Sequence, residues 1–220
     1  MNDDNGQKNV KMLGYTPEQY KLFTKNAWIV LLAFSVLYCM LYCGRQNINY
    51  IMPAMMQEEG WRELDLGILA SVLFWTYGLG HLFNGRLGEI FGVNKFIVAG
   101  MFLSAIANLL IGFQSSLVII AILWGFNGYF QSMLWSPGMA LLANWWPGHR
   151  RGFATGLANG FSGLGQVCAA LAVSLSIIIL PGFGWKAGFI IPAAIMILTG
   201  IIYLFFIKDS PKKIGLKDYV

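Results

Sequence analysis

Residues 27–54 read AWIVLLAFSVLYCMLYCGRQNINYIMPA, a long apolar run whose only charged residue is Arg45. A helix needs about 20 mostly apolar residues to cross a bilayer, and this run is longer than that. The whole 220-residue chain is 57% hydrophobic and 11% charged, whereas soluble domains carry about 25% charged residues. The composition excludes most soluble enzymes, nucleic-acid-binding domains and disordered proteins, and indicates a multi-span membrane protein.

Five further runs extend this interpretation. A turn is expected at residues 114–116, and Pro181-Gly182 should separate the last two runs. We therefore predict an all-α membrane protein with a polar tail at 1–26, a bundle at 27–207 and the start of a linker at 208–220. The six predicted spans are 27–54, 66–84, 96–113, 117–143, 153–180 and 187–207.

The basic residues indicate an orientation. Most Lys and Arg lie in the two tails and in the connections after the second and fourth spans. The opposite connections carry only Arg62 and Lys186, together with several acidic residues. Since cytoplasmic connections are enriched in Lys and Arg, both termini are predicted to be cytoplasmic in a multi-pass cell-membrane protein.

Arg45 is the first candidate for a functional residue, because an ionisable side chain within a span is costly unless it faces a cavity or a partner. Tyr38, Tyr42 and Asn49 share its helix face at spacings of three to four residues. No predicted span contains an acidic residue to neutralise Arg45. Its fork of donors fits a phosphate or a carboxylate, so the stripe predicts an anion site.

Polar stripes also occur on the second, fourth and fifth spans, which we expect to line a cavity, while the third and sixth spans support them. The alternative for each Asn, Ser or Thr is a hydrogen bond that holds two helices together. The residues of these stripes are Tyr77, His81 and Asn84, then Asn127 and Gln131, and then Thr155, Asn159, Ser162 and Gln166.

Motifs for catalysis and cofactors are absent. The sequence contains no nucleotide-binding glycine loop, no HExxH and no GxSxG. Cys39, Cys43 and Cys168 lie within apolar runs and are expected to be inert buried thiols. We predict no enzyme activity, no catalytic residue, no metal and no cofactor; the expected partners are a small anion and the bilayer, not nucleic acid.

Several motifs follow one another along the chain. The connection from Gly85 to Lys95 reads GRLGEIFGVNK. More specific are RQNINY at 45–50, GYFQSM at 128–133 and NWW at 144–146, followed by RRG at 150–152 and DSP at 209–211. The connection resembles the signature loop of the major facilitator superfamily, and the motifs together resemble its organophosphate:phosphate antiporter branch. The resemblance covers almost all of the chain after residue 25.

The resemblance implies a fold of two inverted three-helix repeats, which together form the N-terminal half of a transporter. It implies that Arg45 grips phosphate and that Tyr38 and Tyr42 line the same site. The signature loop would act as a gate; its candidate residues are Gly85, Arg86, Glu89 and Lys95. The predicted substrate-binding set is Arg45, Tyr38, Tyr42, Asn49, Asn127, Gln131, Asn159 and Ser162.

The chain departs from the branch at three positions. Gln46 replaces a Lys, Ser162 replaces a membrane-buried His, and Glu89 replaces the Asp of the loop. The resemblance therefore implies exchange of a small organophosphate for inorganic phosphate by alternating access, without identifying the substrate. The alternatives are a non-transporting sensor of a sugar phosphate and a transporter of another organic anion such as a carboxylate. A second six-helix half, or a homodimer partner, is expected to complete the site.

Overall fold

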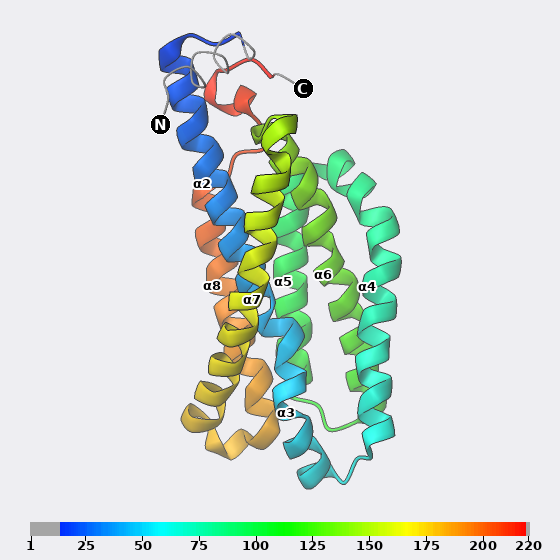
Figure 1. Cartoon of the computed structure of the whole chain (residues 1–220). Coiled ribbons are helices and arrows are strands. Elements are labelled where there is room, and N and C mark those ends of the chain that lie inside the picture. The colour runs from blue at the N-terminus through cyan, green and yellow to red at the C-terminus, as the bar shows by residue number, and fades with distance from the viewer. Residues whose placement is uncertain (1–13, 219–220) are drawn as a thin grey trace.

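The computed structural model describes residues 14–218, in which six helices are long and apolar enough to cross a membrane. They confirm the predicted all-α fold, and both described ends of the chain lie at the same end of the bundle (Figure 1). The first span consists of α2 (Pro17–Leu41) and α3 (Cys43–Glu59). The others are α4 (Glu63–Phe91), α5 (Val93–Ile111), α6 (Leu117–Trp145), α7 (Gly148–Ile179) and α8 (Ala187–Phe206).

Most helices extend beyond their predicted spans, because hydropathy detects the apolar part of a helix and not its polar turns. The first begins at Pro17 rather than 27, where Thr16 and Gln19 form a capping box. The predicted boundary between tail and bundle at residue 26 therefore lies within α2, and residues 1–13 of that tail lie outside the described part. Residues 112–116 join α5 to α6, with the turn at Gly112 and Phe113 rather than at 114–116. A 3₁₀ helix at Pro181–Lys186 separates α7 from α8, where a break was expected.

The two repeats interlock. Each helix of the first repeat packs most extensively on a helix of the second: α2 on α7, α4 on α6, and α5 on α6 and α8. The α2–α6 approach requires glycine, since a Cβ on Gly138 would lie 2.1 Å from Cζ of Phe34. This packing makes the six helices one bundle and brings α3, α4 and α6 together around Arg45.

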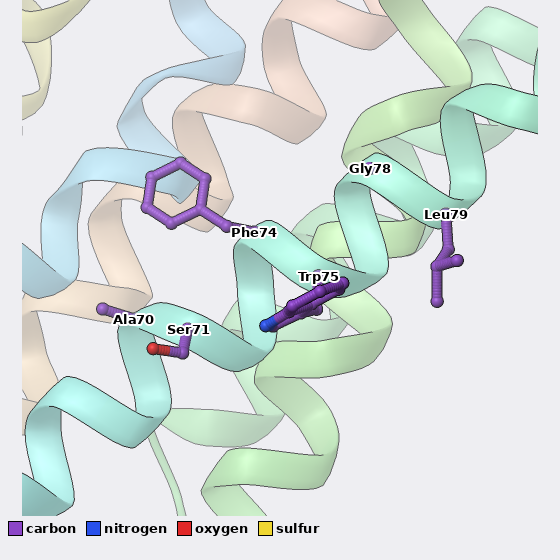
Figure 2. Close-up of a pocket in the computed structure, with 6 residues that line it drawn as sticks. All are labelled: Ala70, Ser71, Phe74, Trp75, Gly78 and Leu79. Atoms are coloured by element: carbon purple, nitrogen blue, oxygen red, sulfur yellow. The ribbon is translucent and has the colours of Figure 1, made fainter.

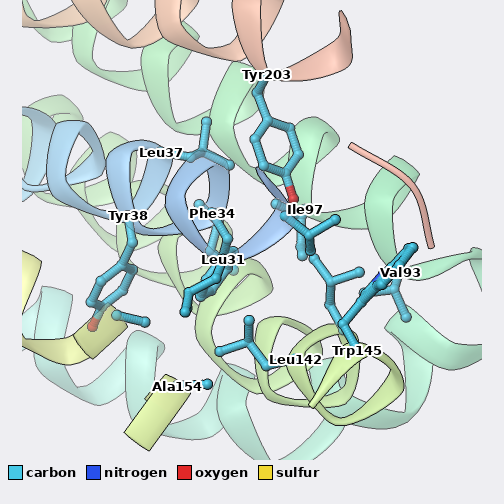
Figure 3. Close-up of a cluster of buried hydrophobic side chains, with 14 of the residues drawn as sticks. Leu31, Phe34, Leu37, Tyr38, Val93, Ile97, Leu142, Trp145, Ala154 and Tyr203 are labelled. Carbon is cyan, nitrogen blue, oxygen red and sulfur yellow. The ribbon is translucent and has the colours of Figure 1, made fainter. Parts of the chain in front are cut away.

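Two apolar clusters fill the bundle. The first joins α2, α5, α6 and α8 near the end with both termini, and Figure 3 shows Phe34, Ile97, Trp145 and Tyr203 in it. The second joins α3, α4, α6 and α8 toward the opposite end and contains Ile51, Leu69, Trp124 and Phe189. The polar groups described below lie on helices that are packed into one or both of these clusters.

Candidate functional site

The first span breaks at Tyr42, a feature that hydropathy did not predict. The backbone N–H of Arg45 donates to Tyr42 O at 3.1 Å, a three-residue step rather than the four-residue step of an α-helix. The carbonyl of Leu41, at the end of α2, instead accepts from Gln131 Nε2 at 3.2 Å. A side chain of α6 thus satisfies the backbone at the break that precedes Arg45.

Buried amides hold the next turn of the first span. Gly44 O accepts from Asn127 Nδ2 at 2.8 Å and from Asn108 Nδ2 at 3.1 Å. Ser104 donates to Asn127 Oδ1, while Asn47 donates to Asn108 Oδ1 at 3.0 Å. Ser104, Asn108 and Asn127 are fully buried, so α3, α5 and α6 are joined by a buried polar network. Asn127 therefore forms hydrogen bonds that hold helices together, which is the alternative given above for the polar residues of the stripes.

Arg45 lies beside this network and is 9% exposed. Its Nε donates to Gln131 Oε1 at 3.0 Å, and its guanidinium carbon is 4.4 Å from the centre of the Tyr77 ring and 4.9 Å from that of Tyr42. Within residues 14–218, its Nη2 is buried without a hydrogen-bond partner, and no ion pair involves Arg45. A buried charge is destabilising unless it is paired, so an anion bound beside Arg45 would be favourable.

Aromatic rings form the rest of the wall. Tyr38 is buried and packs on Trp135 at 4.7 Å and on Tyr42 at 5.5 Å between ring centres. Tyr77 contacts the ring of His81 at 4.3 Å, and His81 Nδ1 lies 2.5 Å from Ser136 Oγ. Tyr77 and Trp135 were not among the predicted site residues. The stripe on the second span had already placed Tyr77 beside a cavity, and Trp135 follows Gln131 by four residues on the same face of α6, so helical spacing could have indicated it as well.

The remaining predicted substrate residues are more open. Asn49 is exposed and donates to Gln46 at 2.5 Å, Asn159 is exposed, and Ser162 is half-buried. Within the described residues, none of the three is hydrogen-bonded to Arg45. The geometry therefore brings Tyr38, Tyr42 and Gln131 around Arg45 and leaves these three on the accessible faces of α3 and α7.

The predicted gating loop is mostly helical, which corrects its description as a loop. Residues 85–91 form the last turns of α4, and only Gly92, with φ of 91°, separates α4 from α5. Gly85 and Gly88 lie within the helix. Among the glycines of this connection, Gly92 is the one with a positive φ, and it ends α4. Arg86 pairs with Glu89 at 2.8 Å on the exposed surface, and Lys95 is exposed.

An apolar pocket lies away from this chemistry. Its lining residues all belong to one face of α4, and Phe74 and Trp75 on that face are 65% and 73% exposed (Figure 2). No charged side chain lines it. It lies on an exposed face of α4 and presents no charged group to an anion.

The sequence relatives are membrane transport and sensor proteins. A probable hexose phosphate transport protein of Chlamydia muridarum is 28% identical over 201 residues, which are 90% of this chain and 42% of that protein. A glycerol-3-phosphate transporter of Bacillus subtilis is 30% identical over 183 residues (81% and 40%), and the membrane sensor protein UhpC of Escherichia coli is 29% identical over 189 residues (85% and 42%). The chain thus spans about two fifths of the length of these relatives and corresponds to their N-terminal half.

The fold is also similar to that of a solved membrane transporter. A bacterial homologue of the human lysosomal transporter Spinster, in an inward-facing and unoccupied conformation, matches with a TM-score of 0.73 at 16% identity, over 84% of this chain and 44% of that one. The profile of the Major Facilitator Superfamily matches residues 34–218, which include the break at Tyr42, Arg45 and all six spans in part or whole. A multi-pass six-helix bundle, the order of its motifs and this match together establish that the chain belongs to the Major Facilitator Superfamily, whose members are transporters and not enzymes.

Proposed function

We propose that this chain forms the N-terminal half of a secondary transporter that exchanges a small organophosphate for inorganic phosphate. The observation that carries the proposal is the Arg45 guanidinium, which is buried, carries a free Nη2 donor and has no acidic partner among residues 14–218. A visiting oxyanion would supply the missing acceptor and the missing charge together.

The chemistry of recognition follows from the geometry. Gln131 occupies Nε of Arg45, which leaves the Nη2 edge for a phosphoryl oxygen. Tyr42 and Tyr77 restrict the guanidinium from two sides, so the donor is held in position before the anion arrives. Since Gln131 is neutral, it orients Arg45 without cancelling its charge. Affinity should remain moderate, because a transporter must also release its cargo.

The choice of a phosphorylated substrate rests on the relatives. Those quoted above include proteins named for transport of hexose phosphate and glycerol-3-phosphate, and another is named a phosphoglycerate transporter. Asn49, Asn159 and Ser162 would contact the rest of the substrate along the accessible faces of α3 and α7, while Tyr38 and Asn127 support the site from behind.

Transport requires a second bundle across from Arg45. Alternating access moves one six-helix half against the other around a central site. The open polar faces of α3 and α7 support a binding surface for that half, which would be the C-terminal half of a longer protein or a second copy of this chain. The last turns of α4, with Arg86 and Glu89, would contact it as a gate on the cytoplasmic side.

The proposed orientation places both termini in the cytoplasm of a cell with this protein in its cell membrane. The described ends of the chain share one end of the bundle with the junctions of α4 with α5 and of α6 with α7 (Figure 1). Arg86, Lys95 and Arg150 belong to the turns beside these junctions, and Lys213 follows α8 near the described C-terminal end. An excess of basic residues at one end favours its retention in the cytoplasm. Lys8 and Lys11, which contribute to the same count, lie outside the described residues.

Two alternatives use the same anion site. The similarity to the sensor protein UhpC favours a role in which sugar phosphate binding is signalled without transport. The similarity to a probable sulfoacetate transporter of Cupriavidus necator, 27% identical over 189 residues, favours an organic anion other than a phosphate ester. An arginine can bind either a phosphate group or another oxyanion. The alternatives therefore differ in whether the ligand is transported and in which ligand binds, but both place it at Arg45.

Proteoliposomes test the proposal. They would contain this chain together with a second bundle, be loaded with phosphate and be supplied with labelled hexose phosphate, glycerol phosphate or sulfoacetate. Uptake that depends on internal phosphate supports exchange. Binding without uptake supports the sensor, and uptake of sulfoacetate alone supports the other organic anion. A parallel sample with this chain alone tests whether a homodimer suffices.

A further inference from the structure

A cleft near the end of the bundle that carries both termini has no role in the proposed transport. It lies between the first turns of α2 and the corner at which α6 meets α7, and the centre of a water-sized group can move within about 30 Å³ of it. A single buried water needs roughly 10–15 Å³ on the same measure, so the cleft admits one small polar group. The lining includes Thr24, Trp28, Trp146, His149 and Arg150.

The start of α7 gives this cleft a positive character. Pro147 precedes the helix, no side chain caps its first N–H groups, and its first turn contains no acidic residue. Exposed His149 and Arg150 occupy that turn instead. Unpaired N–H groups at a helix start carry a partial positive charge and favour an anion.

Trp146 provides a second and independent observation. It lines the same cleft and is only 4% exposed, and its indole Nε1–H is buried without a hydrogen-bond partner in the described part of the chain. The adjacent Trp145 shows the usual outcome, since its Nε1 donates to Lys208 O at 2.9 Å. A buried donor left unsatisfied is destabilising, and an acceptor in the cleft would remove that cost.

Aromatic and basic groups at the mouth indicate which acceptor fits. Trp28 packs against Trp146 at 5.3 Å and against Phe153 at 5.9 Å, and both Trp28 and Phe153 have exposed faces (39% and 55%). Lys21 and Lys25 lie on the same edge of α2 as Trp28, at steps of four and three residues. Exposed aromatic rings beside basic groups are typical of the boundary between lipid headgroups and acyl chains.

We infer that this cleft binds the phosphate group of an anionic phospholipid. One phosphate oxygen would approach the start of α7 and the Trp146 donor, Arg150 would pair with its charge, and the acyl chains would follow Trp28 and Phe153. A free phosphate ion would satisfy the same donors, but it makes no use of the exposed rings. The site is separate from Arg45 and needs no second bundle, so it stands whether or not transport occurs.

The purified 220-residue chain in nanodiscs provides the test. We would count phosphatidylglycerol and phosphatidylcholine molecules retained by native mass spectrometry, and measure apparent affinity by titrating phosphatidylglycerol into phosphatidylcholine nanodiscs and following thermal unfolding. The chain should retain phosphatidylglycerol preferentially. Arg150→Gln should lower that affinity about fivefold, since one basic residue near an anionic surface contributes about 1 kcal/mol. Trp146→Phe, which keeps a ring and removes the donor, should also lower it.

Lys213→Gln is the matched control, because it removes one exposed basic charge from the same end of the bundle outside the cleft. It should change the affinity less than twofold. Equal retention of both lipids, or equal effects of Arg150→Gln and Lys213→Gln, would overturn the inference. Inorganic phosphate added to phosphatidylcholine nanodiscs distinguishes the source: stabilisation that Arg150→Gln abolishes would identify a free anion site and reject the lipid. If Trp146→Phe fails to fold, the exposed Arg150 still decides the outcome.

Discussion

Gln131 Oε1 accepts a hydrogen bond from Arg45 Nε at 3.0 Å, and the same side chain donates to Leu41 O at 3.2 Å and to Ser104 Oγ at 2.9 Å. One neutral amide therefore links the break in the first span, the buried polar network on α5 and the charge at the site. It contacts Arg45 through Nε and leaves Nη2 without a partner among the described residues.

Gln131→Glu should remove anion binding. A carboxylate at this position would lie against the guanidinium in surroundings of low dielectric and act as a permanent counter-charge. We expect phosphate to protect the variant from thermal unfolding at least about tenfold less effectively than it protects the wild type, as loss of a charge-assisted contact predicts. Gln57→Glu, an exposed change near the end of α3 and outside the predicted site, is the control. Wild-type phosphate protection in Gln131→Glu would contradict the role of an uncompensated Arg45.

Gly44→Ala should destabilise the bundle. A Cβ there would lie 2.3 Å from Met196 Sδ and 2.9 Å from Asn108 Nδ2, and these side chains belong to the contacts that hold the break. Overpacking of this kind costs about 1–3 kcal/mol. Gly156→Ala provides the matched comparison, because its Cβ meets nothing within 4 Å, and the variant should be as stable as the wild type or more so. Equal thermal unfolding temperatures for both variants would show that the close approach at Gly44 is unimportant.

Asn108 and Asn127 should show coupled effects. Both donate to Gly44 O, so each single Ala variant leaves the carbonyl one side-chain donor, whereas the double variant leaves it none. Single changes should cost about 0.5–2 kcal/mol, in the range of hydrogen bonds between membrane helices. Because Asn108 Nδ2 also donates to Asn127 Oδ1 at 3.1 Å, the cost of the double variant should differ from the sum of the two by about 0.5 kcal/mol or more. Unfolding in detergent mixtures measures all three, and additive values would mean that the two donors act independently.

Glu89→Gln should affect exchange without affecting stability. Arg86 and Glu89 form an exposed pair, with side chains 76% and 53% accessible, and such pairs contribute no more than about 1 kcal/mol. The unfolding temperature of the chain should therefore change little, while the rate of phosphate exchange by the two-bundle transporter should fall if this turn is a gate. An unchanged exchange rate would assign the pair to the surface alone.

Hydropathy predicted the six spans, because burial in lipid demands long apolar runs and these are visible in one dimension. It did not predict the break at Tyr42, since the residues around it are apolar and the break is stabilised by Gln131 and Asn127 from another helix. The connection at 85–95 was taken for a loop because its glycines and charges are typical of loops, yet residues 85–91 are helical and, of its three glycines, only Gly92 has a positive φ.

The candidate site was predictable in its centre and not in its surroundings. Arg45 is the only charged residue in its apolar run, and charge within a span is a strong signal. Helical spacing indicated Tyr42 and Gln131. It could not distinguish a residue beside the Arg45 guanidinium from one in the buried polar network, such as Asn127. That distinction depends on which face of α6 meets α3, and this is a property of packing.

Titration of the purified chain with inorganic phosphate and with hexose phosphate, followed by thermal unfolding, tests the central claim most directly when the wild type is compared with Arg45→Lys. Lysine keeps the charge and loses the planar fork of donors, so we expect anions to protect the wild type and to protect Arg45→Lys at least about tenfold less effectively. Equal protection of the two proteins, or no protection of the wild type by either anion, would contradict the assignment of Arg45 as the anion-binding residue.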